Sequence, residues 1–218
     1  MTFKAIIFDL DGTLLDTIED LTDSMNAALA GLGYPERSIA ETKQLVGDGL
    51  ATFVRRVLPP SVSDDPDITA RLTERMRAEY RRHNSVKTRL YGGLAELLDA
   101  LTERAIAMAV LSNKPHDSTL EIVKKYFQRW TFGAVFGARD GVPIKPDPAA
   151  ALEIATILHL APAEILYLGD TNTDMWTANA AGMFAVGALW GFRTAAELKQ
   201  AGARILLRHP LDLLTLLN

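Results

Sequence analysis

Two acidic residues, Asp9 and Asp11, follow a short apolar run near the start of the chain, Ala5–Phe8. Such a run predicts a buried strand, and ligands and catalytic groups collect at the carboxyl ends of strands in parallel sheets. Two carboxylates this close repel each other unless a cation or a shared proton relieves the repulsion. Mg2+ would relieve it, because it takes oxygen ligands that include carboxylates and substrate phosphate. The pair therefore indicates a nucleophile beside an acid, although a turn with two solvated acids is the simpler interpretation.

Three later segments carry residue types that a phosphoryl-transfer site needs. Ser112 and Asn113 end a second predicted strand, where a hydroxyl and backbone N–H groups can bind phosphate, although both residues are also common in turns. Lys145 is a compact positive charge suited to a phosphate oxygen, although most lysines simply lie at the surface. Asp170 ends another predicted strand and is placed to bind a metal ion. Asp174 falls in the first turn of the next predicted helix, where an acid also offsets the helix dipole.

The elements that must position these residues alternate between short apolar runs and helical patterns. The predicted strands are Ala5–Phe8, Ala107–Leu111, Ala134–Phe136, Ile165–Leu168, Phe184–Val186 and Ile205–Leu207, and the predicted helices are Gly93–Glu103, Asp117–Tyr126, Asp147–Leu158 and Thr173–Ala181. Strands and helices in alternation form a parallel sheet with helices on both faces. We therefore expect an α/β fold with a Rossmann-like parallel sheet.

One stretch, from Leu14 to about Arg89, interrupts this alternation. It contains helical segments and turns but no convincing strand, and Ile18, Leu21, Met25, Leu29 and Leu32 form one apolar stripe at helical spacing. We expect a small helical cap domain at residues 14–89, inserted after the first strand, and a core domain of residues 1–13 and 90–218. A helical module inserted there is expected to lie over the carboxyl edge of the sheet and act as a lid.

The composition excludes several classes of function. The chain has 218 residues and no cysteine, so disulfides, thiolate catalysis and cysteine-bound zinc are excluded. The formal net charge of -4 and the mixed placement of Lys and Arg argue against nucleic acid as a partner. We interpret the arginines of residues 71–82 as a solvated helix face. Because no long apolar segment occurs, we expect no membrane partner and a cytoplasmic location. A cap of exposed helices allows a dimer, so we expect a monomer or homodimer.

In this order, the polar segments resemble the signature of the haloacid dehalogenase superfamily of phosphatases. The motifs Asp-x-Asp-Gly-Thr, Ser, Lys and Gly-Asp-x-x-x-Asp match Asp9–Thr13, Ser112, Lys145 and Gly169–Asp174. The resemblance covers nearly the whole chain, including the helical cap. Within the superfamily the chain is most similar to the phosphoglycolate phosphatase group, on the basis of Val46–Gly49 followed by Arg55 and Arg56, of Ser112–Pro115 and of Leu189–Gly191.

The resemblance implies a role for each matched residue. Asp9 would attack phosphorus to form an aspartyl phosphate, and Asp11 would protonate the leaving oxygen and later take a proton from water. Lys145 would bridge toward Asp9. Mg2+ would be held by Asp9, the backbone carbonyl of Asp11, Asp170 and, directly or through water, Asp174. Substrate contacts would come from Gly12, Thr13, Ser112 and Asn113 in the core, and from Gly47, Asp48 and Gly49 in the cap.

We therefore expect a Mg2+-dependent phosphatase that acts on a small phosphorylated metabolite, phosphoglycolate or a similar one. A sugar phosphomutase would share this chemistry, but Asn172–Asp174 resembles the phosphatase form of the last motif. A pyrophosphatase and a non-catalytic metabolite-binding relative are further alternatives. Asp11 argues against dehalogenases proper and phosphonate hydrolases, since both lack this second acid. Thr171 departs from the serine that is common in the family, and Asp48 adds a negative charge where relatives often have asparagine.

Overall fold

The computed structural model describes residues 2–217, and the contacts between residues divide the chain into two compact units. The core unit comprises the N-terminal segment up to Leu15 and the chain from Leu90 onward, and the helical unit comprises Asp16–Arg89. The chain passes between the units at β2 (Leu15–Asp16) and β3 (Arg89–Leu90), which pair with each other. These two strands were not expected, because two residues are too few to show any periodicity.

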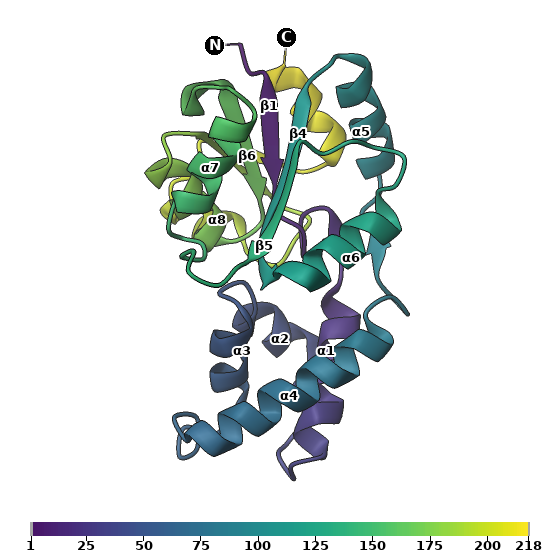
Figure 1. Cartoon of the computed structure of the whole chain (residues 1–218), viewed down its shortest axis with the longest axis vertical. Coiled ribbons are helices and arrows are strands. Elements are labelled where there is room, and N and C mark those ends of the chain that lie inside the picture. The colour runs from purple at the N-terminus through teal and green to yellow at the C-terminus, as the bar shows by residue number, and fades with distance from the viewer. Residues whose placement is uncertain (1, 218) are drawn as a thin grey trace. The chain divides into compact units, whose positions relative to one another are not determined.

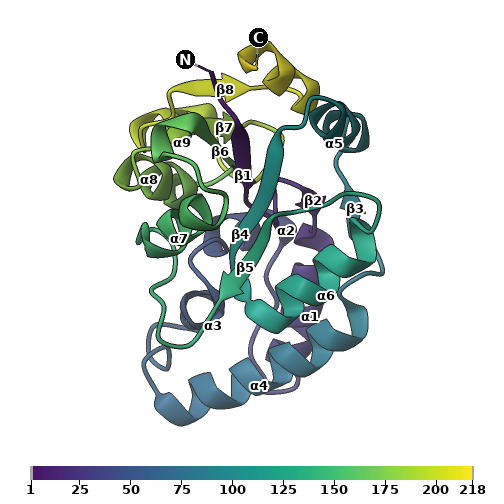
Figure 2. The same cartoon turned by 45° about the horizontal axis from the view of Figure 1, so that its top comes forward.

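A six-stranded parallel sheet forms the centre of the core unit. Its strands, in spatial order, are β5 (Ala134–Ala138), β4 (Ala107–Pro115), β1 (Ala5–Phe8), β6 (Ile165–Gly169), β7 (Phe184–Ala188) and β8 (Ile205–Leu207). Figure 2 shows this order. All five pairings in the sheet are parallel. The predicted α/β fold class is confirmed.

Helices cover both faces of this sheet (Figure 1). They are α5 (Leu94–Glu103), α6 (His116–Tyr126), α7 (Ala149–Ile157), α8 (Asn172–Ala180) and α9 (Ala195–Gln200), with short 3-10 helices at Pro162–Glu164 and Pro210–Leu216. The four predicted helices end within two residues of the observed bounds, whereas α9 and the 3-10 helices were missed. Because both faces are covered, every residue of β1 is fully buried, which explains its continuous apolar sequence.

The strand order reverses direction at β1. From β1 the chain adds β4 and β5 on one side, and then returns to add β6, β7 and β8 on the other. In open parallel sheets, a crevice for ligands forms at the carboxyl ends of the strands where the order reverses. Asp9 follows β1 and Asp170 follows β6, so both acids lie at this position.

Strand β4 is longer than the apolar run Ala107–Leu111 that predicted it. It continues to Pro115, so Ser112, Asn113 and Lys114 belong to the strand itself. Its pairing with β5 shifts register between Leu111 and Pro115. A bulge of this kind re-aims side chains, and its sequence looks like a turn because polar residues replace the apolar pattern.

The helical unit consists of α1 (Ile18–Ala30), α2 (Ile39–Leu45), α3 (Leu50–Val57) and α4 (Pro66–His83). Helices α1 and α4 pack along each other (Figure 1). In the predicted stripe of α1, Ile18, Met25 and Leu29 are buried, and the flanking leucines are half-buried. These side chains therefore form part of the apolar interior of the unit.

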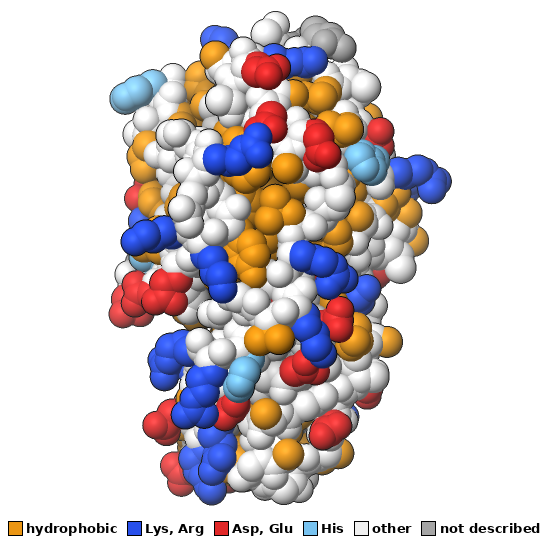
Figure 3. All heavy atoms as spheres, turned by 90° about the vertical axis from the view of Figure 1, so that its right-hand side faces the viewer, with side chains coloured by type: hydrophobic (Ala, Val, Ile, Leu, Met, Phe, Trp, Pro, Cys, Tyr) orange, Lys and Arg blue, Asp and Glu red, His pale blue; other side chains and the backbone are white. Residues whose placement is uncertain are grey.

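The arginines that the sequence assigned to a solvated helix face lie at the surface. The arginines of α4 (Arg71, Arg75, Arg77, Arg81 and Arg82) are all exposed, and Arg82 pairs with Glu79 at 3.2 Å. On the face shown in Figure 3, basic side chains lie beside acidic ones in both units. Among the described residues, no helix combines the length and the hydropathy needed to cross a bilayer.

Candidate active site

Asp9 is fixed at the end of β1 by backbone and side-chain contacts. Its N–H donates to the Leu168 carbonyl of the neighbouring strand at 2.9 Å. Its carboxylate Oδ1 accepts from the Leu10 N–H at 2.7 Å and lies 2.9 Å from the Lys145 Nζ. The residue is only 6% exposed. Contacts with Leu10 and Lys145 therefore hold one oxygen of the Asp9 carboxylate in place.

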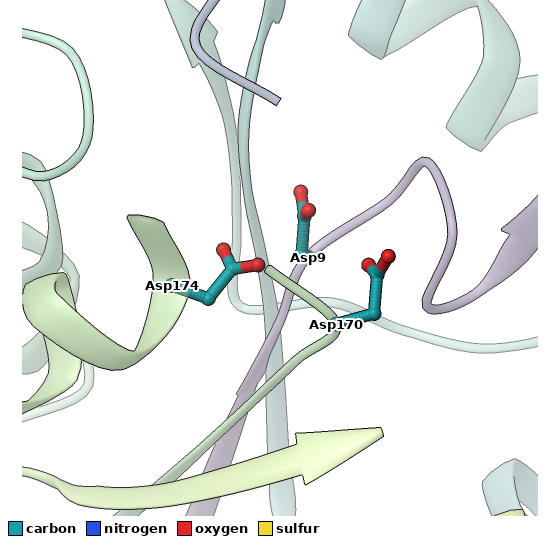
Figure 4. Close-up of side chains that lie close together, drawn as sticks. All are labelled: Asp9, Asp170 and Asp174. Carbon is teal, nitrogen blue, oxygen red and sulfur yellow. The ribbon is translucent and has the colours of Figure 1, made fainter. Parts of the chain in front are cut away.

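Three buried carboxylates converge at this point (Figure 4). Asp9, Asp170 and Asp174 each place one oxygen within 4.8 Å of the others. They come from the end of β1, the end of β6 and the first turn of α8. Lys145, 2% exposed in its side chain, contacts two of them. Three carboxylates against one ammonium leave two negative charges uncompensated, which a divalent cation would balance.

Asp170 is completely buried and is held by two donors. Its Oδ1 accepts from the Thr13 hydroxyl at 2.8 Å, and its Oδ2 accepts from the Phe192 N–H at 2.8 Å. Added Cβ atoms at Gly12 or Gly191 would clash with its side chain, so both glycines make room for it. Burial and the neighbouring Asp174 raise the pKa of Asp170 to about 7.

Asp174 combines two roles between which the sequence could not decide. It is the third residue of α8, and its Oδ2 accepts from the N–H and hydroxyl of the N-cap Thr171 at 3.0 and 2.7 Å. Its Oδ1 accepts from the Lys145 Nζ at 2.7 Å. One oxygen thus caps the helix while the other faces the acid cluster. Thr171 performs the capping that serine would also perform.

Lys145 is tied to β4 through its backbone. Asn113 donates from Nδ2 to the Lys145 carbonyl at 3.0 Å and accepts from the Lys145 N–H at 2.9 Å. Burial alone lowers the pKa of Lys145, but the carboxylates of Asp174 and Asp9 raise it well above its usual value. The ammonium therefore stays charged, and the Asn113 side chain positions the segment that carries it.

The electrostatics of the cluster fit a bound cation. Burial, followed by repulsion from Asp174, raises the pKa of Asp9 well above its usual range, and Lys145 only partly offsets this. Without a further positive charge, Asp9 and Asp170 tend to keep protons. Hard oxygen donors of this kind suit Mg2+. Asp9, Asp170 and Asp174 are therefore suited to hold such an ion.

Asp11 lies outside this cluster. Its carboxylate accepts from the Lys114 Nζ through both oxygens, at 2.9 and 2.8 Å. Any role in holding a metal would therefore fall to its backbone carbonyl, which stays a prediction. Lys114 belongs to the Ser112–Pro115 segment that matches the family, but no role was predicted for it, although a lysine at a buried strand end beside Ser112 and Asn113 indicates one.

Comparison with known proteins decides the family. The model of the haloacid dehalogenase-like hydrolase family matches residues 6–188. This chain is a haloacid dehalogenase-like hydrolase.

Named relatives of this hydrolase include phosphoglycolate phosphatases. Phosphoglycolate phosphatase 1 of Pseudomonas aeruginosa is 30% identical over 221 residues, which cover 97% of this chain and 78% of the relative. Phosphoglycolate phosphatase of Mannheimia succiniciproducens is 32% identical over 197 residues, 87% of each chain. A crystal structure described as a predicted phosphoglycolate phosphatase from Haemophilus somnus has a TM-score of 0.92 at 26% identity, and the match covers 100% of this chain and 99% of that one. The predicted family resemblance is confirmed.

The remaining predicted substrate-binding residues fall in both units of the hydrolase. Ser112, buried at the end of β4, accepts from the Lys114 N–H through its Oγ at 3.2 Å, so its own O–H can donate elsewhere. Gly47, Asp48 and Gly49 lie between α2 and α3 of the helical unit. Asp48 pairs with Arg56 at 2.6 Å, so its negative charge is compensated within that unit. Their role toward a substrate stays a prediction.

Two further residues of the hydrolase support the site and were not predicted. Trp190 donates from Nε1 to the carbonyl of Thr13 at 3.0 Å, which ties the turn after β1 to the loop after β7. Phe192 supplies the backbone donor to Asp170. The sequence reasoning linked residues 189–193 only to the family pattern, because a backbone donor leaves no signal in residue type.

Proposed function

We propose that this hydrolase is a Mg2+-dependent phosphatase that hydrolyses a small phosphate monoester, phosphoglycolate or a similar metabolite, through an aspartyl phosphate on Asp9. One observation carries the proposal. Three buried carboxylates lie within 4.8 Å of one another with one lysine in contact with two of them, and a fourth carboxylate, Asp11, is paired with a different lysine. The names of the relatives support phosphoglycolate as the first substrate to test.

The first half of the reaction is phosphoryl transfer to Asp9. The Leu10 N–H and Lys145 hold Oδ1, which leaves Oδ2 as the oxygen that attacks phosphorus. A new bond between this oxygen and phosphorus forms as the bond to the leaving oxygen breaks, and Asp11 gives that oxygen its proton. Ser112 and the Asn113 N–H bind phosphoryl oxygens. Bound Mg2+ would neutralise the charge that makes a carboxylate and a phosphate repel each other.

The second half is hydrolysis of the aspartyl phosphate. Asp11, now ionised, takes a proton from a water molecule whose oxygen attacks phosphorus. The bond between phosphorus and the Asp9 oxygen breaks, which releases inorganic phosphate and restores the carboxylate. Asp11 serves both halves because its carboxylate lies outside the metal-binding cluster and is therefore available for proton transfer.

The test is phosphate release from p-nitrophenyl phosphate and from a panel of phosphoglycolate, sugar phosphates, nucleotides and pyrophosphate, with and without Mg2+. We expect hydrolysis only with Mg2+, and a loss of about 10,000-fold or more in Asp9→Asn because the nucleophile is removed. Asp117→Asn, at an exposed position in the first turn of α6, is the matched control.

Other outcomes would favour the alternatives. Isomerised sugar phosphate without free phosphate would identify a mutase. Cleavage of pyrophosphate alone would identify a pyrophosphatase. Full activity in Asp9→Asn would refute the assigned nucleophile. Binding of metabolites without any turnover would leave a non-catalytic relative.

A further inference from the structure

Lys114 is a buried lysine for which the phosphatase scheme so far has no task. Its side chain is 5% exposed, and its Nζ contacts both carboxylate oxygens of Asp11, whose side chain is 18% exposed. Taking an ammonium group out of water is costly unless it is paired and hydrogen-bonded. A lysine held this way is therefore expected to matter to its partner.

The end of β4 assigns a different partner to each of three successive residues. Ser112 keeps its O–H available for a phosphoryl oxygen, Asn113 binds the backbone of Lys145, and Lys114 reaches across to Asp11. The register shift between Leu111 and Pro115 lies in this segment. Consecutive residues of a regular strand point to opposite faces, so this irregularity is compatible with three residues serving one site.

The two lysines of the site divide its acids between them. Lys145 contacts Asp9 and Asp174, whereas Lys114 contacts Asp11. Asp11 lies only two residues from Asp9, and a carboxylate without a partner there would be available to the same cation that the three-acid cluster attracts. A carboxylate bound to a metal ion could no longer transfer a proton. Pairing with Lys114 removes this competition.

We propose that Lys114 is a positioning residue that holds the Asp11 carboxylate apart from the Asp9, Asp170 and Asp174 cluster and directs it to the leaving oxygen. The inference rests on the proposed phosphatase function. Because Nζ contacts both oxygens, one contact remains when the other oxygen carries the proton for the leaving group. Lys114 therefore orients Asp11 in both halves of the reaction without itself touching the reacting atoms.

The test compares Lys114→Met with the wild type on two phosphate esters. The nitrophenolate leaving group of p-nitrophenyl phosphate needs little protonation, whereas an alkyl phosphate such as phosphoglycolate needs a general acid. We expect kcat/KM to fall by about 100-fold on the alkyl ester and by about 10-fold or less on the aryl ester, because kcat/KM reports the transfer to Asp9 and not the hydrolysis that both esters share. The Mg2+ concentration for half-maximal activity should not rise. Lys124→Met, at an exposed position on α6, is the matched control.

Two further variants separate positioning from folding. Lys114→Arg keeps the charge and can contact both oxygens, so we expect it to recover part of the activity on the alkyl ester. The double variant Asp11→Asn with Lys114→Met should be no less active than Asp11→Asn alone, since a residue that acts through Asp11 has no effect once Asp11 is lost. It also removes both charges together, so it stays informative if Lys114→Met does not fold.

Equal losses of kcat/KM on both esters, or additive losses in the double variant, would overturn the assignment of Lys114. In that case the proposed function would still stand, because the wild type would be active with Mg2+ and the Asp9→Asn variant would be inactive. Failure of the proposed function would instead show as a wild type that releases no phosphate from any ester.

Discussion

Buried carboxylates occur in both units of this hydrolase, but the groups that surround them differ in number and charge. In the helical unit, Asp20 is 2% exposed and accepts hydrogen bonds from the Lys87 N–H, the Thr88 N–H and the Thr88 hydroxyl. In the core unit, Asp9, Asp170 and Asp174 repel one another, and of these Lys145 contacts only Asp9 and Asp174. Asp20 accepts hydrogen bonds from neutral donors of Lys87 and Thr88, at the end of the helical unit, whereas the cluster holds three acids against one lysine.

The contrast between Asp20 and the three-acid cluster gives a criterion for telling a structural acid from one that is proposed to be functional. The hydrogen bonds from Lys87 and Thr88 satisfy the Asp20 carboxylate within the fold, so Asp20 needs no ligand. They also connect α1 to the segment that follows α4. The cluster is destabilised by its own charges, and such a site is maintained where a cation or a charged substrate completes it. Burial alone therefore does not identify the site, but the balance between acids and donors does.

Among the variants that test this comparison, Asp170→Asn should have the largest effect. The substitution removes one of the proposed cation ligands, so kcat with Mg2+ should fall by about 1,000-fold. It also removes a repelling charge from a buried cluster, so the metal-free protein should be at least as stable as the wild type at pH 7.5. Phosphate release and thermal unfolding without metal measure the two effects. A large loss of stability with unchanged activity would reverse the comparison and make Asp170 the structural acid.

Asp20→Ala should show the opposite pattern. It leaves three donors without their acceptor, and we expect a loss of about 2–4 kcal/mol in the free energy of unfolding. Phosphatase activity per folded molecule should stay near that of the wild type. Urea unfolding and kcat at low temperature measure the two quantities. Thr88→Val, which removes one of the three donors, should cost roughly 1 kcal/mol, and an equal cost for both variants would contradict the shared role of the donors.

The stability of the metal-free protein should decrease as the pH rises from about 4 to about 7. The pKa of Asp170 is about 7 in the folded protein against an ordinary 3.8, so the folded state binds more protons in this window and loses stability as they leave. Mg2+ should raise the Tm more at pH 7.5 than at pH 5.5, because the ion binds the ionised carboxylates. Scanning calorimetry at both pH values tests this, with Asp170→Asn as the control. An identical pH dependence in this variant would show that Asp170 is not the group responsible.

The smallest effect is expected from Asp48→Ala in the helical unit. Asp48 is paired with Arg56 and lies in a turn, so its loss should change KM for phosphoglycolate by roughly 2- to 10-fold while kcat on p-nitrophenyl phosphate stays the same. Comparing Asp48→Ala with Arg56→Ala separates the charge of Asp48 from the ion pair. Unchanged KM values across several phosphate esters would remove this turn from the substrate site.

The fold class and the positions of the acids in the core unit could be predicted from the sequence. The apolar runs marked all six strands of the large sheet, because strands buried on both faces must be apolar throughout. The polar residues that follow β1 and β6 could be assigned to one edge because parallel strands share an end. The spacing of Asp9, Asp11, Ser112, Lys145, Asp170 and Asp174 then gave the family resemblance that the comparison confirmed.

The pairing of each acid with its donor could not be predicted before the fold was known. Lys114 is 103 residues from Asp11, and Lys145 is 29 residues from Asp174, so neither pairing leaves a local pattern in the sequence. The same holds for the Phe192 N–H on Asp170, a contact made by backbone that every residue except proline possesses. The sequence specified the acids by residue type and strand end, whereas the balance of charges around each of them depends on side chains and backbone groups that only folding brings within hydrogen-bond distance.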